Sequence, residues 1–160
     1  MNLIHEKTKS ALSEQDMNLL HITHALGKLR VYLPVLTVHL DDEDVVEHID
    51  QLIFRFMKTQ DGIGRRLIPL IVEAIEPDTA EMTFIDKLNR LEKFGLIERD
   101  EWNLYRKIRN DLTHTYPEEK QELVAAINEA INIVPQLEAT YLKMKLFCHE
   151  KILSPLGENG

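Results

Sequence analysis

The sequence of 160 residues contains little glycine, proline or cysteine, with six Gly, six Pro and one Cys. So few turn-forming residues argue against a sandwich of short strands and favour long helices. Cys148 cannot form a disulfide within the chain, and its apolar neighbours Leu146, Phe147 and Ile152 predict that the thiol packs as a small hydrophobic side chain. We therefore expect an all-α protein in a reducing compartment.

Long apolar runs and an excess of positive charge are missing as well. No apolar segment approaches the roughly 20 residues that span a bilayer, and the first residues, MNLIHEKTKSAL, lack the apolar core of a secretory signal. The formal net charge of −8 argues against a general nucleic-acid binder, which displays a broad basic face. We expect a cytoplasmic protein with no membrane contact, in which any contact with RNA is local.

The remaining composition suits one helical domain. Hydrophobic residues make up 44% and charged residues 29% of the chain, which is enough apolar content for one sizeable core. Apolar residues recur at helical spacing, and no repeat or linker divides the sequence. These features predict a single domain over residues 1–160, built as an up-and-down bundle of four or five helices.

Capping signals set the expected bounds of the first three helices. The pattern S-E-Q-D resembles a capping box and predicts a first helix from Ser13 to about Tyr32. The acidic residues 41–44 suit the first turn of a second helix, which should kink or break between Gly62 and Pro69. A capping box at residues 83–86 begins a third helix, which ends at Gly95.

Prolines bound the last two helices. A fourth helix should run from Asp100 to about His114, because Pro117 disfavours α geometry at Tyr116. Pro117 suits the first turn of a fifth helix, which we expect to be interrupted at Pro135 and to resume beyond it.

The segment D-E-W-N-L-Y-R-K-I-R-N-D-L-T-H-T-Y-P, residues 100–117, gathers the residue types that carry chemistry. Arg106, Lys107 and Arg109 form an expected positive patch, and the planar donor fork of arginine matches a phosphate. His114 can transfer protons near neutral pH. Cleavage of RNA through its own 2′-hydroxyl requires such proton transfer and positive donors around the phosphate. The segment therefore suggests a ribonuclease site that needs no metal or other cofactor.

The spacing of Arg109 and His114 presents a geometric difficulty. Five residues advance an α-helix by about 500°, so the two positions lie about 140° apart around the axis. A helix end at Pro117 would let His114 and Tyr116 point to the same side in extended chain. A second copy of the chain could bring the remaining groups together.

Residues 109–116, R-N-D-L-T-H-T-Y, match the R-x-x-x-x-H-x-Y signature of HEPN ribonucleases, and the chain resembles the HepT toxins of bacterial toxin-antitoxin pairs. Supporting similarity extends through Asp50-Gln51, Arg55-Phe56, Lys58, Gln60 and Asp61, and through F-I-D-K-L-N-R-L-E-K-F-G-L-I at residues 84–97. The resemblance thus covers about residues 45–120. It implies an endoribonuclease toxin that acts as a homodimer or a higher even oligomer.

The same resemblance implies roles for four residues. Arg109 and His114 would be catalytic, the first binding the phosphate of the RNA substrate and the second transferring protons, with Asn110 in support. Arg106, from the expected positive patch, is a further supporting and phosphate-binding candidate. The implied partner is a minimal nucleotidyltransferase antitoxin that transfers AMP to Tyr116.

Other interpretations of these residues stay open. The chain could be a non-catalytic HEPN binding subunit of a nucleotidyltransferase, or a helical dimerisation domain in which Arg109 and His114 only satisfy a helix end. We assign Trp102 and Tyr105 to packing rather than to base stacking.

Two further groups suggest sites only weakly. His21 and His24 lie one helical turn apart, but with His39 or His48 they form no complete metal-ligand set. Arg65 and Arg66 follow G-I-G without the spacing of a phosphate loop, so we interpret them as a solvated basic turn near the cleft.

Overall fold

The computed structural model describes residues 2–114 and 118–154, and in these ranges every regular element is helical, which confirms the all-α class. Its α-helices are α1 (Leu3–Leu29), α2 (Glu43–Gly62), α3 (Ile68–Ile75), α4 (Phe84–Lys93), α5 (Arg99–His114) and α6 (Lys120–Lys151). Short 3-10 helices η1 (Arg30–Tyr32) and η2 (Thr37–Asp41) lie between α1 and α2, and the π-helix η3 (Ile63–Leu67) joins α2 to α3.

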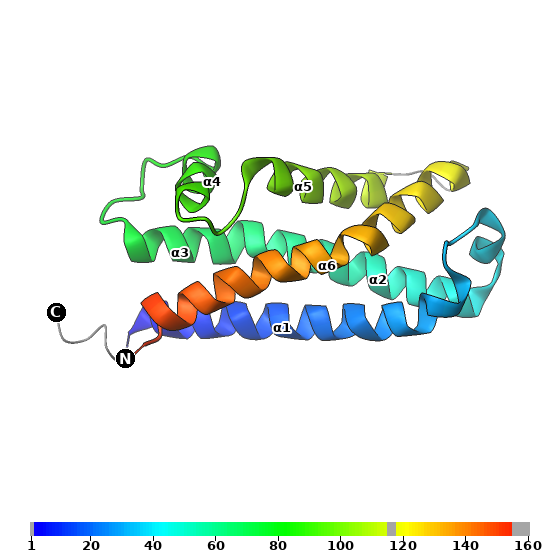
Figure 1. Ribbon diagram of the computed structural model, residues 1–160, viewed down its shortest axis with the longest axis horizontal. Helices are drawn as coiled ribbons and strands as arrows, with labels where there is room; N and C mark the ends of the chain where they lie inside the picture. Colours follow the sequence, from blue (N-terminus) through cyan, green and yellow to red (C-terminus); the bar gives the residue numbers. More distant parts are fainter. Residues whose placement is uncertain (1, 115–117, 155–160) are drawn as a thin grey trace.

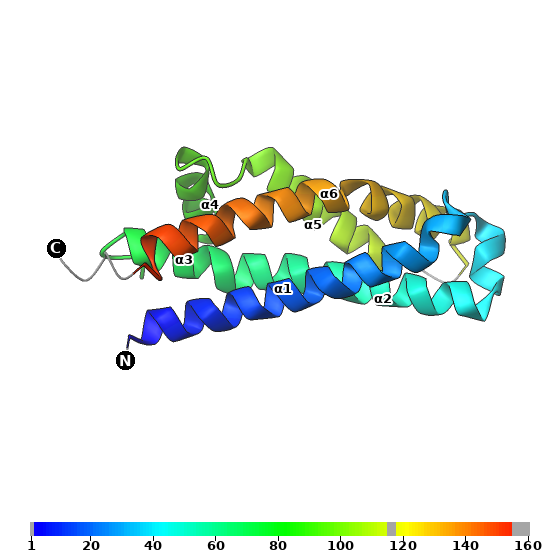
Figure 2. The same ribbon diagram turned by 60° about the horizontal axis from the view of Figure 1, so that its bottom comes forward.

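The long helices alternate in direction, as the up-and-down prediction requires (Figure 1). α1 packs along α2, while α6 contacts α5, α1 and α2. In Figure 1, α6 runs diagonally between α5 and α1, and in Figure 2 it crosses α5. The described residues thus form a bundle in which α4 is a short side element at one end of α5.

The predicted start of the first helix is wrong, because Ser13 lies inside α1. Asn2 caps the helix instead, and its Oδ1 accepts a hydrogen bond of 3.2 Å from the backbone N–H of Ile4. Thr8, Ala11 and Leu12 are buried at helical spacing before Ser13. Since that burial extends the apolar face toward the N-terminus, the helix continues through a sequence that would cap it elsewhere.

The second helix begins as predicted and then continues into a π-helical turn instead of ending. Asp42 caps α2 by accepting a bond of 3.0 Å from the N–H of Asp44. At the predicted break, the chain passes through the π-helical turn η3, where the N–H of Ile68 bonds to the carbonyl of Ile63. Pro69 then lies in the first turn of α3, where its missing N–H is tolerated.

α4 confirms the capping-box prediction. Thr83 Oγ1 accepts from the N–H of Asp86 at 3.1 Å, and Asp86 Oδ2 accepts from the N–H of Thr83 at 3.0 Å. These hydrogen bonds with Thr83 hold the pKa of Asp86 below its usual value. Gly95, with a φ of 70°, follows the end of the helix in the left-handed region.

α6 departs from prediction at its start and at Pro135. It begins at Lys120, a few residues after Pro117, which lies outside the described residues, and it continues through Pro135 without interruption. A proline removes one helical hydrogen bond, yet Val134 and Leu137 on either side are buried. Packing of this face against the bundle stabilises the helix where the local signal predicted a break.

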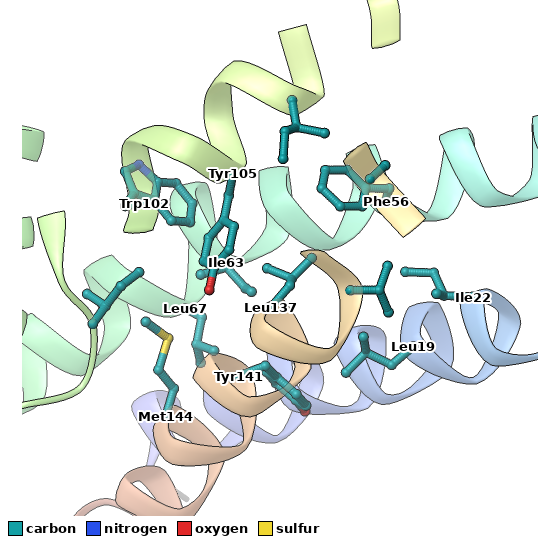
Figure 3. Packing of buried hydrophobic residues seen from close by; sticks show 14 of the residues in the cluster. Leu19, Ile22, Phe56, Ile63, Leu67, Trp102, Tyr105, Leu137, Tyr141 and Met144 are labelled. Atoms are coloured by element: carbon teal, nitrogen blue, oxygen red, sulfur yellow. The ribbon is translucent and has the colours of Figure 1, made fainter. Parts of the chain in front are cut away.

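The core is one cluster in which side chains of α1, η3, α5 and α6 meet (Figure 3). The Tyr141 hydroxyl donates to the backbone carbonyl of Leu12 at 3.0 Å and to Asp16 at 2.6 Å, which ties α6 to α1. Cys148 is fully buried, as predicted, and burial raises the pKa of its thiol to about 12. No described helix is long and apolar enough to cross a membrane.

Candidate functional site

A cavity of about 430 Å³ opens where α2, η3, α4 and α5 meet. α2 contributes Gln60 and Asp61 to its wall, η3 contributes Gly64 and Arg65, and α4 contributes Phe84. We call it the α5 cavity, because α5 supplies the rest of the wall.

The α5 wall consists of Trp102, Arg106, Arg109 and Asn110. Their spacing of four, three and one residues places them along one side of the helix. Tyr105, Ile108 and Leu112 lie toward the core and are buried. The structure therefore brings together three of the five residues proposed from the sequence, namely Arg106, Arg109 and Asn110.

Arg109 is held by a carboxylate from a different helix. Its Nε donates to Asp61 Oδ1 and its Nη2 to Asp61 Oδ2, both at 3.2 Å. The two side chains are only 21% and 28% exposed, so this paired geometry is partly shielded from water. Among the described residues, the contacts of Nη1 are longer, at 3.5 Å to Asn110 and Thr113. Asp61 thus orients the guanidinium and leaves its Nη1 edge least engaged.

Two further arginines in the wall carry positive charge without a carboxylate partner. Arg65 and Arg106 are both exposed, and within residues 2–114 and 118–154 neither guanidinium pairs with an acidic group. Three arginines therefore line the cavity, and Asp61 is the one acidic side chain among the described residues of its wall. The arrangement favours an anionic ligand even though the protein as a whole is acidic.

The prediction that Lys107 forms one positive patch with Arg106 and Arg109 is wrong. Its ammonium group lies 2.8 Å from Asp111 and 3.9 Å from Glu129 of α6, on another side of the helix. The hydrogen bond to Asp111 and the charge of Glu129 raise the pKa of Lys107. Because successive helical residues are rotated by about 100°, neighbours in sequence are separated and only Arg106 and Arg109 reach the cavity.

Arg66 likewise lies apart from the cavity that its neighbour Arg65 lines. It pairs with Glu14 of α1 and donates to Ser10 Oγ at 3.2 Å. The predicted solvated basic turn is a π-helical turn, and of its two arginines Arg65 lines the cavity.

The other two proposed site residues fall at the end of α5. His114 is the last helical residue, as predicted, and its side chain lies outside the described part. Tyr116 lies outside the described residues altogether. Since α5 remains helical through His114, the positions of Arg109 and His114 differ by about 140° around the axis of one copy. The need for a second copy, inferred from the spacing, therefore stands as a prediction.

Trp102 and Tyr105 are core residues, which confirms their assignment to packing. They are 3% and 0% exposed, and Figure 3 shows both projecting from α5 toward the side of Ile63. The Tyr105 hydroxyl lies 2.9 Å from Thr140 Oγ1, and burial raises its pKa to about 12. The sequence did not indicate that the ring of Trp102 also lines the α5 cavity.

Among the described residues, no group of three His, Cys, Asp or Glu side chains is arranged to hold a metal ion. His21 and His24 contact each other edge to face, with ring centroids 6.2 Å apart.

The sequence did not indicate that five wall residues belong to one site, namely Gln60, Asp61, Gly64, Arg65 and Phe84. Asp61 and Gln60 did appear in the upstream similarity, and Arg65 was expected near a cleft. No local signal shows that a carboxylate 48 residues before Arg109 becomes its partner, because that contact depends on how α2 packs against α5.

Comparisons of the chain with protein-family models, with curated proteins and with solved structures found no match. Function must therefore be inferred from the α5 cavity and from the motif that borders it.

Proposed function

We propose that the chain is an endoribonuclease of the HEPN class, similar to the HepT toxins, that cleaves RNA without a metal ion. The observation that carries the proposal is the position of Arg109, the first residue of the R-x-x-x-x-H-x-Y motif. It lines a cavity together with Arg65 and Arg106 in a protein of net charge −8. Concentrated positive charge in an otherwise acidic protein supports a local phosphate-binding role.

In the proposed reaction, the 2′-hydroxyl oxygen of the RNA attacks the adjacent phosphorus, and the bond to the 5′-oxygen breaks. His114 takes the proton from the 2′-hydroxyl or returns one to the leaving 5′-oxygen, the second His114 of a dimer serving the complementary step. Arg109 and Arg106 stabilise the negative charge on the phosphate in the transition state, and Asn110 supports Arg109. The products are a 2′,3′-cyclic phosphate and a free 5′-hydroxyl.

The dimer is part of this proposal. Arg109 and His114 diverge around α5 in one copy, so a two-fold axis near the motif would let Arg109 of one protomer face His114 of the other. We expect a dimer or a higher even oligomer in sedimentation at micromolar concentration. A strict monomer that still cleaves RNA would contradict the composite site.

Cleavage of RNA by the purified chain in EDTA is the direct test. We expect 2′,3′-cyclic phosphate ends in EDTA and loss of cleavage in His114→Ala. Activity that disappears on chelation and returns with a divalent ion would overturn the mechanism.

Regulation by a nucleotidyltransferase antitoxin is the second element of the proposal, with Tyr116 as the AMP acceptor. AMP at this position would add charge and bulk two residues after His114 and compete with RNA for the arginines. Intact-mass analysis after incubation with the neighbouring gene's product, ATP and magnesium should show AMP on the wild-type chain. Tyr116→Phe should gain none and retain much of its cleavage activity; equal labelling of both chains would contradict the role of Tyr116.

One observation favours the alternative of a non-catalytic subunit bound to a nucleotidyltransferase. Asp61 accepts two hydrogen bonds from Arg109, and a guanidinium neutralised in this way attracts a phosphate less strongly. A chain that binds the nucleotidyltransferase and leaves RNA intact under all conditions would support this alternative.

A further inference from the structure

The α5 cavity contains more than a phosphate needs. Gln60, Phe84 and Trp102 line it alongside the arginines, and none of the three has a role in the cleavage chemistry. Its volume of about 430 Å³ falls within the range of about 300–1000 Å³ that is common for small-molecule sites. A ligand larger than a phosphate group would therefore be accommodated.

Gln60 is an unpartnered amide in the wall. It is 5% exposed and lines the cavity, and in the described part of the chain its side chain has no hydrogen-bond partner. The amide atoms of Gln60 are not among the described polar atoms that are buried without a partner, so the amide is accessible from the cavity that it lines. It offers one donor group and one acceptor to a ligand that enters the cavity.

The aromatic residues form an apolar wall beside this amide. The rings of Phe84 and Trp102 lie 5.9 Å apart between centroids and are tilted by 46°. In the part of the chain that the structure describes, the Trp102 indole Nε1 is buried without a hydrogen-bond partner. Flat rings beside an unsatisfied amide suit a planar heteroaromatic ligand with polar edges.

The π-helical turn packs closely against the Trp102 ring at Gly64. A Cβ at Gly64 would lie 2.8 Å from Trp102 Cζ2 and 3.0 Å from Cη2, so only glycine permits this approach of η3 to α5. π-helical turns within α-helices occur frequently at functional sites. Here the turn brings both Gly64 and the exposed Arg65 to the cavity wall.

We propose that the α5 cavity binds one unstacked nucleotide of a single-stranded RNA. The base lies against the half-buried Phe84, at the edge of the buried Trp102, with its polar edge toward Gln60, and the phosphate contacts Arg65 and Arg106. Proteins that read single-stranded RNA combine aromatic walls, edge hydrogen bonds and arginines in this way. The inference rests on the proposed function in that the nucleotide belongs to the RNA whose next phosphate reaches Arg109.

Trp102 is the only tryptophan of the chain, so its fluorescence reports on this cavity alone. The wild-type protein is titrated with the four nucleoside 5′-monophosphates, with ribose 5-phosphate, and with a short single-stranded RNA whose 2′-O-methyl riboses cannot attack the phosphate. We expect at least one nucleotide to bind about tenfold more tightly than ribose 5-phosphate, and the RNA to bind more tightly still.

Two variants and a matched control locate the binding. Gln60→Met keeps the size of the side chain and removes the amide, so it should reduce the preference for nucleotide over ribose 5-phosphate at least threefold. Arg65→Gln should weaken binding of the RNA about tenfold through loss of a charged donor. Arg30→Gln, at an exposed arginine outside the cavity, should leave binding unchanged.

The outcomes separate this inference from the ribonuclease proposal. Nucleotide-dependent fluorescence without any RNA cleavage would support the cavity and refute the nuclease. Cleavage with no fluorescence change, or ribose 5-phosphate binding as tightly as every nucleotide, would overturn the nucleotide pocket. Binding of free nucleotides but not of the methylated RNA would also overturn it, because the cavity would then serve a soluble nucleotide.

Discussion

Lys107 and Arg109 are two residues apart on α5, yet their ion pairs differ in origin. Lys107 pairs with Asp111 one turn along its own helix, and the two side chains are 61% and 43% exposed. Arg109 pairs with Asp61 of α2 across the bundle, at 21% and 28% exposure. The first pair follows from helical spacing and is largely screened by water. The Arg109–Asp61 pair requires two helices to pack, and it orients a side chain at a cavity. Two residues of equal charge in one segment therefore need not have equal function.

The largest expected effect comes from replacing the cations of the two ion pairs, Arg109 and Lys107. Arg109→Ala should lower kcat/KM for RNA by about 100- to 1000-fold, the cost of losing one group that stabilises transition-state charge. Lys107→Ala should change kcat/KM less than about twofold, because an exposed local pair contributes little. Initial rates on one RNA substrate, with circular dichroism to verify the fold, provide the measurement. Equal losses in both variants would mean that the α5 cavity is not the site of cleavage.

A second pair of variants compares two glycines. Gly64 lies in a tertiary contact, whereas a substitution at Gly27 changes only the local helix propensity. The Cβ of Gly64→Ala would collide with the buried Trp102, and this overpacking should lower the free energy of unfolding by about 1–3 kcal/mol. Gly27→Ala in α1 meets nothing within 4 Å and should raise it by about 0.5–1 kcal/mol through helix propensity. Urea denaturation followed by circular dichroism distinguishes the two signs. Stabilisation by both substitutions would show that Trp102 moves freely.

Neutralising Asp61 should have a smaller effect on RNA cleavage than replacing Arg109. In Asp61→Asn, the guanidinium of Arg109 loses its orienting charge, and kcat should fall about tenfold. KM should fall about threefold, because one negative charge near the RNA phosphate is removed. Glu129→Gln, which alters only the exposed environment of Lys107, is the control and should change neither constant. A lower kcat with an unchanged KM would assign Asp61 to orientation alone.

The smallest effect concerns the wholly local capping box of α4. Its hydrogen bonds with Thr83 lower the folded-state pKa of Asp86 below 3.8, so the ionised carboxylate stabilises the folded state. That contribution is complete above the unfolded pKa and is lost as the pH falls through the lower folded pKa. Asp86→Asn should therefore be less stable than the wild type at pH 6, and the difference should shrink below about pH 3.8. A difference that persists at the lowest pH would indicate a contribution other than ionisation.

The fold was predicted best where its signals are local. The box at Thr83 and Asp86, the glycine at position 95 and the helix end at His114 each depend on a few neighbouring residues, and all three were predicted correctly. Ser13 and Pro135 also carry local signals, but burial of the surrounding face keeps both inside helices. A capping or breaking signal contributes about 1–3 kcal/mol, which packing of a long amphipathic face can exceed.

The sequence by itself determined the helical class, the alternation of long helices and the segment on α5 that carries Arg106, Arg109 and Asn110. These depend on helical periodicity and residue type, which are properties of short stretches of chain. Only the tertiary structure decided that Asp61 holds Arg109 and that Gln60, Arg65 and Phe84 complete the cavity wall. Contacts between different helices depend on how the helices rotate and pack, and no local pattern encodes that rotation.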